Sequence, residues 1–523
     1  MALLLCLGLA LPLTGCTPAA QEKGAAVDPT EGNERVFYQI FVGSFSDSNG
    51  DGIGDLRGVI DRLDYLNDGD INSGESLGVQ GIWLSPIFKS PSYHKYDASD
   101  YYTIDSRFGT EEDLKELLEL CHARNVKVIL DLAINHTAKT NPWFTRFAEA
   151  HAAGNTESEY YDFYSWVSKD DRKAGITYLP IPGCGADEWY ECNFSSDMPE
   201  LNFDNEAVRQ EVLNIARHYL DLGVDGFRFD AVKYIYYGET SRCVEFWQWY
   251  MDELRALKPD IYCVGECWSG EGEVLAYYPA MNCFNFAASQ AEGMIAAAAK
   301  GGDINNFTGY VSSYQAKVRE ANPDGMPISF LSNHDMDRSA GYLMLASHFA
   351  QMGVNLYLLS PGSPIIYYGE EIGMKGTRGS ANTDANRRLA MLWGDEDTVR
   401  DPEGTTYDRA KQTNGTVASQ MEEGSLLRHY QALISLRVKY PEIGRGTYTA
   451  LNCGSKKVGG FLVEDGESTL VILHNVSRSE ELTVDLSKAG VSAAQLCEVV
   501  GMGQAKLEGT TLTIAAQTSV ILR

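Results

Sequence analysis

Short apolar runs and longer stretches of helical periodicity alternate along most of the chain. Apolar runs bounded by polar loops are typical of strands buried on both faces, and apolar positions three and four residues apart are typical of amphipathic helices. Strands are predicted at 35–42, 81–88, 126–136, 223–233, 261–267, 283–286, 327–335 and 364–371. Helices are predicted at 111–124, 205–222 and 241–257, from residue 339 onward, and at 423–440. About eight strands alternating with helices predict an α/β protein with a (β/α)8 TIM barrel.

The alternation breaks down in two parts of the chain, and both are interpreted as additions to the barrel. Residues 137–203 are rich in Tyr, Trp, Gly and Asp and predict an irregular subdomain inserted after the third strand. From about residue 445 the pattern changes to short alternating strands, which predict a C-terminal antiparallel β-sandwich domain. The predicted domains are therefore a barrel formed by 34–136 and 204–442, an insert at 137–203, and a β domain at 443–523.

The N-terminus carries an apolar run, residues 2–13, that is too short to span a bilayer as a mature helix. It ends in Leu13-Thr14-Gly15-Cys16, which resembles the lipobox of a bacterial lipoprotein signal. We therefore expect a signal peptide at 1–15, lipidation of Cys16 and a flexible linker at 16–33. The predicted location is extracellular, with the protein tethered to the cell surface and in contact with the membrane only through its lipid. The alternative is an ordinary secretory signal with an incidental cysteine.

Composition narrows the choice of partner. The chain has 523 residues and a formal net charge of −29, which argues against a nucleic-acid partner because phosphate groups attract basic surfaces. A neutral or cationic substrate fits this charge. The 29 Tyr and 8 Trp supply flat rings of the kind on which sugars stack. In an exported chain, Cys184 and Cys192 are spaced to close a short disulfide loop.

A loop after the first predicted strand alternates oxygen-bearing side chains with glycines. Such an alternation lets a loop wrap a hard cation, and this loop resembles the start of an EF-hand. It predicts a structural Ca²⁺ site, with Mg²⁺ as the second choice. The predicted ligands are the side chains of Asp47, Asn49, Asp51 and Asp55 and the carbonyl of Ile53. The alternative is a solvated turn rich in Asp and Gly.

The predicted fourth barrel strand contains two charged residues, Arg228 and Asp230, inside an apolar run. Residues two apart in a strand point to the same side, so these two side chains are expected to lie next to each other. The arginine is expected to lower the pKa of the aspartate and hold it ionised, as a nucleophile requires. The alternative is a structural ion pair.

Polar residues gather at the carboxyl ends of the predicted strands, where such barrels carry their active sites. They are Asp131, Asn135 and His136 on the third strand, Arg228 and Asp230 on the fourth, Glu266 on the fifth, and Asn333, His334 and Asp335 on the seventh. Three carboxylates that converge on one face predict glycoside hydrolysis by a pair of acids. Asp230 is then the nucleophile, and Glu266, in less charged surroundings that raise its pKa, is the proton donor. Asp335 is expected to hold sugar hydroxyls and stabilise the transition state.

Four segments resemble the signature regions of the α-amylase family of glycoside hydrolases. In the family's order and spacing, they are 131–136 (DLAINH), 226–233 (GFRFDAVK), 264–266 (VGE) and 330–335 (FLSNHD). Residues 198–202 resemble a fifth region, and Asn386-Arg387-Arg388 with Trp393 resembles the eighth βα loop, so the resemblance covers 35–523. It implies a retaining mechanism with Asp230 as nucleophile, Glu266 as acid/base and Asp335 as stabiliser. It also implies a set of substrate-binding residues: Tyr96, His136, Arg228, Lys233, His334 and Arg338.

The chain departs from the family's pattern at several positions. Tyr234 stands where many amylases have His, which leaves the leaving-group contacts open. Asn202 stands where typical amylases place a Ca²⁺-binding Asp, which argues against a second Ca²⁺ bound through Asn135. The segment Tyr93-His94-Lys95-Tyr96 resembles the Tyr-His-Gly-Tyr of endo-acting amylases. The Asp that caps the chain end in exo-glucosidases is missing near this point, so an open cleft is expected.

Five further residues have two interpretations each. Three of them lie in the insert, and their rings are expected either to stack on glucosyl units or to pack locally: Trp166, Trp189 and Tyr190. The other two, Glu370 and Glu371, end the predicted eighth strand. They either contact substrate or form hydrogen bonds behind the site, and the second interpretation is favoured.

The predicted function is a retaining endo-acting α-amylase that hydrolyses α-1,4-glucosidic bonds in starch and maltooligosaccharides and acts as a monomer. The alternative within the family is an α-glucosidase or a cyclomaltodextrinase/neopullulanase-type enzyme on short α-glucans. A non-catalytic sugar-binding relative is expected to lack catalytic carboxylates, and this chain has all three. Transglycosylation stays open, because water and a sugar acceptor compete for the same glycosyl-enzyme.

Overall fold

The computed structural model describes residues 33–523 except 72, 345–347, 409–410, 412–413 and 492–494. The signal peptide, the lipidation at Cys16 and nearly all of the linker therefore lie outside the described residues. Among the residues that are described, no helix has both the length and the apolar character needed to cross a membrane.

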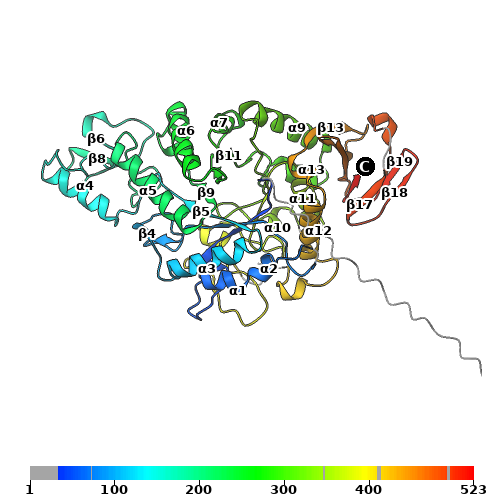
Figure 1. The fold of residues 1–523 in the computed structure, drawn as a ribbon, viewed down its shortest axis with the longest axis horizontal. Helices are drawn as coiled ribbons and strands as arrows, with labels where there is room; N and C mark the ends of the chain where they lie inside the picture. Colours follow the sequence, from blue (N-terminus) through cyan, green and yellow to red (C-terminus); the bar gives the residue numbers. More distant parts are fainter. Residues whose placement is uncertain (1–32, 72, 345–347, 409–410, 412–413, 492–494) are drawn as a thin grey trace, which may run out of the picture.

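Parallel strands form the barrel at the centre of the molecule (Figure 1). Their order in the sheet is β11-β10-β9-β5-β2-β1-β12. The bounds are β1 Phe37–Ile40, β2 Gly81–Leu84, β5 Lys127–Leu132, β9 Gly226–Phe229, β10 Tyr262–Gly265, β11 Asn282–Cys283 and β12 Ile365–Tyr367. Two parallel bridges, Phe284 to Ile328 and Phe330 to Ile365, link the outer strands β11 and β12. The predicted seventh strand thus closes the barrel through these two bridges.

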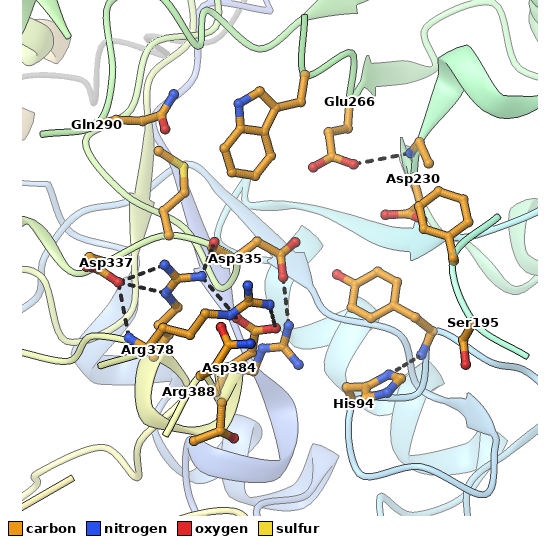
Figure 2. A pocket seen from close by; sticks show the side chains of 18 of the residues that line it. His94, Ser195, Asp230, Glu266, Gln290, Asp335, Asp337, Arg378, Asp384 and Arg388 are labelled. Atoms are coloured by element: carbon orange, nitrogen blue, oxygen red, sulfur yellow. Dashed lines mark hydrogen bonds and ion pairs between the residues drawn. The ribbon is translucent and has the colours of Figure 1, made fainter. Parts of the chain in front are cut away.

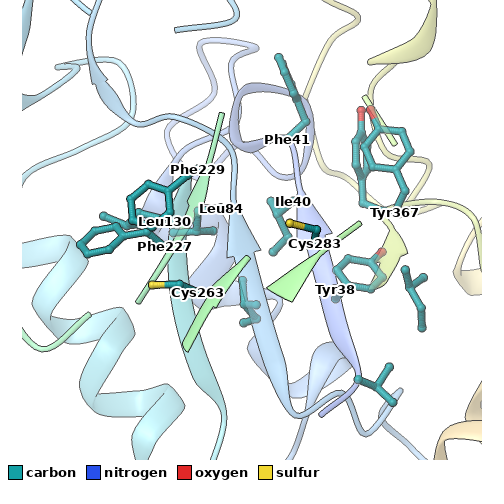
Figure 3. Packing of buried hydrophobic residues seen from close by; sticks show 14 of the residues in the cluster. Tyr38, Ile40, Phe41, Leu84, Leu130, Phe227, Phe229, Cys263, Cys283 and Tyr367 are labelled. Carbon is teal, nitrogen blue, oxygen red and sulfur yellow. The ribbon is translucent and has the colours of Figure 1, made fainter. Parts of the chain in front are cut away.

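Side chains on the strands alternate between the inside and the outside of the barrel, as the pleat requires. Phe37 and Trp83 belong to an inner cluster with Ile129, Tyr262 and Val264. A neighbouring set faces the helices outside the barrel (Figure 3): Tyr38, Ile40, Leu84, Leu130, Phe227 and Phe229. A Cβ atom on Gly81 would lie 2.4 Å from the ring of Phe37, so only glycine leaves room for this ring on the neighbouring strand.

Helices surround the strands, and local signals set their ends. Thr110 forms a capping box with Asp113 at the start of α3, and Gly223 ends α5 with a left-handed φ of 109°. The main helices are α3 Glu111–His122, α5 Glu206–Leu222, α6 Thr240–Leu257, α9 Ile304–Ala321, α11 Phe349–Leu358 and α12 Leu426–Lys439. Shorter ones are α1 Leu56–Asp61, α2 Leu63–Leu66, α7 Glu271–Tyr277, α8 Met294–Ala299, α10 Ser339–Tyr342 and α13 Glu442–Arg445. The sequence pattern did not predict α9, which packs against β13 and β14 of the C-terminal domain.

The insert between β5 and α5 is more regular than the sequence predicted. It contains a helix, α4 Pro142–Ala152, which Asn141 caps, and a small antiparallel sheet of order β6-β8-β7. The bounds of the sheet are β6 Trp166–Ser168, β7 Tyr178–Pro180 and β8 Glu188–Glu191, and a β3 Phe88–Lys89 to β4 Asp100–Ile104 pair precedes the insert. Cys184 and Cys192 are both free thiols, so the disulfide loop that their spacing allows is not formed in this structure.

The C-terminal domain consists of two antiparallel sheets (Figure 1). The larger has the order β13-β14-β15-β20-β17 and the smaller β16-β19-β18. Their bounds are β13 Thr447–Asn452, β14 Val458–Asp465, β15 Ser468–Asn475, β16 Leu482–Asp485, β17 Leu496–Gly501, β18 Ala505–Glu508, β19 Thr511–Ile514 and β20 Thr518–Leu522. One apolar cluster joins the two sheets, with Leu473 and Val520 from one and Val484 and Leu512 from the other. The predicted barrel, insert and C-terminal antiparallel domain are therefore all present.

Candidate active site

A cavity of about 1100 Å³ opens at the carboxyl ends of the barrel strands. Asp230 directly follows β9, Glu266 directly follows β10, and Asp335 follows the bridged segment 328–330. Figure 2 shows these three carboxyl groups facing the same cavity. Of the nine residues predicted for catalysis or substrate binding, six line it: Tyr96, His136, Asp230, Lys233, Glu266 and Asp335.

Arg228 lies buried behind the cavity and contacts three carboxyl groups. Its Nη1 lies 2.7 Å from Asp131 Oδ1 and 2.7 Å from Asp230 Oδ1. Its Nη2 lies 3.0 Å from Glu266 Oε2. The expected pairing of Arg228 with Asp230 is present, and it is part of a larger network. Burial raises the pKa of Asp131 to about 7 against the opposing effect of Arg228.

The pKa of Asp230 lies above its ordinary value, because burial raises it more than Arg228 lowers it. Arg228 lowers this pKa, as expected, but its effect is smaller than that of burial. A hydrogen bond donated by Glu266 favours the ionised form of Asp230. Glu266 itself has a raised pKa, first through burial and then through the negative charges of Asp230 and Asp335. The raised pKa was predicted, but its cause is burial and not distance from charge, since Arg228 contacts this group.

Asp335 has the opposite electrostatic setting. Burial acts to raise its pKa, but His334 and Arg388 hold it well below the ordinary value. His334 Nε2 lies 3.0 Å from Asp335 Oδ2, and Arg388 Nη2 lies 2.7 Å from Asp335 Oδ1. The cavity therefore contains one carboxylate with a lowered pKa and a directly interacting pair, Asp230 and Glu266, whose pKa values are both raised.

Aromatic side chains next to the carboxyl groups hold one another in place through hydrogen bonds and stacking. Tyr96 Oη lies 2.8 Å from Asp131 Oδ2 and 2.6 Å from His334 Nε2, and the two rings stack at 5.2 Å. Gln39 donates to His334 Nδ1 at 2.7 Å, which leaves the proton of a neutral imidazole on Nε2, facing Asp335. Burial lowers the pKa of His136 to about 4, so this ring is neutral at physiological pH.

Arg338 does not reach the cavity. It is buried, and it donates to the carbonyl oxygens of Arg387 at 3.0 Å and Tyr368 at 2.6 Å. Its predicted role in substrate binding is therefore wrong. Arg388 is the arginine that lines the cavity and contacts Asp335, and it also donates to Tyr93 Oη at 3.0 Å. The segment Asn386-Arg387-Arg388 had been noted in the sequence, but nothing there separated the two arginines.

Two exposed aromatic rings stand at the rim of the cavity and were missed by the sequence. Trp268 is 42% exposed and stacks on Phe286 at 4.9 Å, and Phe194 is 41% exposed and packs on Tyr234 at 4.3 Å. Lys233 Nζ donates to the carbonyl of Trp268 at 2.8 Å, which ties the two sides together. The exposure of these two rings is set by the fold, and no local sequence signal marks it.

The residues with two interpretations lie outside the cavity. Tyr190 is buried, and Trp189 packs under the guanidinium of Arg172 at 4.1 Å. Trp166 pairs across β6 and β8. Glu370 and Glu371 are buried and accept hydrogen bonds from tyrosines and Ser332.

One end of the cavity carries a network of charged pairs that the sequence did not reveal (Figure 2). Arg387 lies 2.8 Å from Asp337 and 3.0 Å from Asp384. Arg378 lies 2.6 Å from Asp384. These side chains come from the loop after β12 and the loop after Asp335, so only the fold brings them together.

The loop predicted to bind Ca²⁺ folds around its own aspartates. Asp47 accepts from the backbone of Gly50 at 2.8 Å and Gly52 at 2.7 Å, and Asp55 accepts from Gly58 at 2.6 Å as the cap of α1. Throughout the described parts of the chain, no group of three or more His, Cys, Asp or Glu is arranged to hold a metal ion. The Ca²⁺ site stays a prediction.

Comparison with known proteins agrees with this geometry. The family described as "Alpha amylase, catalytic domain" matches residues 39–446. The "Alpha-amylase 3" of Dictyoglomus thermophilum is 34% identical over 450 residues, which cover 85% of each chain. The structure of Eubacterium rectale Amy13B superposes with a TM-score of 0.85 at 34% identity, over 94% of this chain and 95% of the other.

Other relatives with similar coverage have different described activities. The "4-alpha-glucanotransferase" of Thermotoga maritima is 29% identical over 85% of this chain and 96% of its own length. The "Oligo-1,6-glucosidase" of Parageobacillus thermoglucosidasius is 30% identical over 85% of this chain and 90% of its own. These relatives share action on α-glucosidic substrates and differ in the bond and the acceptor. The chain belongs to the α-amylase family of glycoside hydrolases and is an enzyme that acts on α-glucans.

Proposed function

We propose that this enzyme is a retaining endo-acting α-amylase, which hydrolyses internal α-1,4-glucosidic bonds in starch and maltooligosaccharides. The cavity volume of about 1100 Å³ carries the proposal. Pockets for single small ligands span about 300–1,000 Å³, so this cavity has room for several glucosyl units. The exposed rings of Trp268 and Phe194 at its rim offer flat surfaces for further units of a longer chain.

The proposed reaction uses the three carboxyl groups in different roles. Asp230 attacks the anomeric carbon while Glu266 gives its proton to the leaving oxygen, and a covalent glycosyl-enzyme forms. Glu266 then takes a proton from water while the water oxygen attacks the anomeric carbon, which breaks the bond to Asp230 and releases the sugar with retained configuration. Asp230 and Glu266 interact directly, which fits a retaining enzyme, because inverting enzymes keep their carboxyl groups about 6.5–9.5 Å apart for a water molecule. Asp335, held ionised, stabilises the positive charge of the transition state.

A time course on soluble starch tests endo action. We expect the iodine-staining polymer to disappear while few reducing ends have formed, with maltooligosaccharides as early products. A maltooligosaccharide blocked at its non-reducing end should be cut at a rate similar to its unblocked counterpart. Early release of glucose alone, together with no action on the blocked substrate, would show an α-glucosidase. Preferred action on cyclodextrin or pullulan would favour the cyclomaltodextrinase/neopullulanase alternative.

The proposal includes structural Ca²⁺ in the loop 47–55, whose side chains supply only oxygen donors, the ligand type that Ca²⁺ prefers. The bound ion would tie this loop to the start of α1 and contribute to stability. We expect a chelator to lower Tm and added Ca²⁺ to restore it, with no such response in an Asp51→Asn variant. An unchanged melting curve would remove the ion from the proposal.

The proposal also places the enzyme at the cell surface through lipid on Cys16, as a monomer. Its support is the apolar run and the Leu-Thr-Gly-Cys sequence at the N-terminus. Mass spectrometry of the mature N-terminus should show a lipidated cysteine, and Cys16→Ser should release the protein into the medium. Light scattering should give the mass of one chain.

A further inference from the structure

The loop of residues 90–97 carries three ring residues into the catalytic cavity, and the residue between two of them points away. Tyr93, His94 and Tyr96 line the cavity, whereas Lys95 lines only a second cavity of about 370 Å³, which Tyr93 borders as well. Lys95 is only 2% exposed. A lysine side chain is seldom buried this deeply unless it has a partner.

The backbone of Lys95 has a φ of 66°, in the left-handed region. This region is unfavourable for any residue with a Cβ atom and free of that penalty for glycine. The amylase pattern that this segment resembles has glycine at the same place. The structure around Lys95 must therefore supply interactions that hold the unfavourable conformation.

The amine of Lys95 forms a buried ion pair. Its Nζ lies 2.5 Å from Asp105 Oδ2 and donates to the carbonyl of Ser90 at 3.2 Å. Asp105 also accepts from the guanidinium of Arg107 at 3.0 and 3.1 Å, and its backbone N–H donates to the carbonyl of Ile87 at 2.8 Å. The ion pair thus joins the cavity loop to the fixed turn that follows β4.

The loop held in this way presents Tyr96 to the catalytic groups. The Tyr96 hydroxyl contacts Asp131 and His334, and the backbone carbonyl of Tyr96 lies 3.1 Å from His136 Nε2. A shift of the loop would move this hydroxyl and the stacked His334 ring together. A displacement of about 1 Å at a catalytic centre can cost 10²-fold in rate.

We propose that Lys95 is a positioning residue for the reaction, and that its ion pair with Asp105 holds Tyr96 against Asp131 and His334. The role applies to cleavage of any α-glucoside in this cavity. It therefore goes beyond the proposed endo action and does not depend on it.

Lys95→Gly tests the proposal, because glycine keeps the left-handed backbone and removes the ion pair. We expect kcat on a chromogenic maltooligosaccharide to fall roughly 10- to 100-fold, with KM changed less than threefold. Lys95→Arg, which keeps the cation, should recover part of kcat. Asp105→Asn removes the other partner and should lower kcat in the same direction, so it serves where Lys95→Gly is poorly folded. The matched control is Lys115→Ala, which removes an exposed ion pair with Glu111 and should leave kcat unchanged.

A double-mutant cycle separates positioning from general stability. In a Tyr96→Phe background, Lys95→Gly should lower kcat by less than half as much, on a logarithmic scale, as it does in the parent. The proposal is overturned if kcat of Lys95→Gly and Asp105→Asn stays within twofold of the parent while Tm falls. It is also overturned if Lys95→Gly lowers kcat by the same factor in the Tyr96→Phe background as in the parent. Substrate choice between starch and short glucosides is not the readout, so a failed endo proposal leaves this test intact.

Discussion

Two pairs of buried carboxyl groups stand at the ends of barrel strands and differ in what surrounds them. Asp230 and Glu266 follow β9 and β10, share Arg228 and open onto the catalytic cavity. Glu370 and Glu371 follow β12, and hydroxyl groups surround them: Tyr357, Tyr430 and Ser332 on Glu370, and Tyr38 and Tyr65 on Glu371. Burial raises the pKa of every member of both pairs.

The difference shows what turns a buried acid pair into a catalytic one. Arg228 supplies a positive charge that lowers the pKa of both Asp230 and Glu266 and so offsets part of the burial penalty. Hydroxyl groups satisfy the oxygens of Glu370 without supplying a full charge, and burial raises its pKa to about 7. The first pair can therefore exchange a proton with substrate, whereas the second affects only stability.

The largest expected effect comes from neutralising the catalytic pair. Asp230→Asn removes the nucleophile, and we expect kcat to fall by roughly 10⁴-fold or more, while Glu266→Gln removes the proton donor and should cost about 10²–10⁴-fold. Both substitutions preserve shape, so Tm should change little. Steady-state kinetics on maltooligosaccharides and thermal unfolding give the two readouts.

The matched control for these variants is Glu370→Gln. It makes the same carboxyl-to-amide change at a strand end, and it should retain kcat within about twofold because the side chain does not reach the cavity. Near-normal turnover of Asp230→Asn, or a large loss in Glu370→Gln, would reverse the assignment of the two pairs.

A smaller effect is expected when Arg228 is replaced by lysine. The charge remains, but an ammonium cannot bridge Asp131, Asp230 and Glu266 as the planar guanidinium does. We expect kcat/KM to fall about 10²-fold. The cation lowers the pKa of both Asp230 and Glu266, so weakening it raises both, and the acid limb of the pH profile should move to higher pH. Measuring kcat/KM from pH 4 to 9 checks this, and a shift to lower pH would contradict it.

Much of the site was predictable from the sequence because barrel strands place their ends on one face. The positions of Asp230, Glu266 and Asp335 follow from strand alternation and from the resemblance to the family. The pKa of Asp230 was not predictable, because its direction depends on a balance between burial and Arg228 that only packing decides. The orientation of Arg338 was missed for a similar reason, since a sequence cannot show which carbonyl groups surround a side chain.

The same limit applies to regions without a regular pattern. Helix α4 in the insert and helix α9 before the seventh strand position were missed, although Asn141 and Asp303 cap them. A cap is a short signal and does not by itself predict a helix. Trp268 and Phe194 stand at the rim through their packing on Phe286 and Tyr234, which the sequence does not show.

The smallest expected effect is on stability at the second pair. Glu370 has a pKa of about 7 in the folded protein against an ordinary value of 4.5, so its stabilising contribution is complete below pH 4.5 and is lost as pH rises through about 7. This difference between the folded and the ordinary pKa corresponds to on the order of 3 kcal/mol in the free energy of unfolding. Glu370→Gln removes this titration, although its amide accepts fewer hydroxyl hydrogen bonds. Urea unfolding at pH 5, 6, 7 and 8 should therefore show that the free energy of unfolding of the variant rises relative to that of the parent as pH increases. A stability difference between Glu370→Gln and the parent that does not vary with pH would show that burial does not raise the pKa of Glu370.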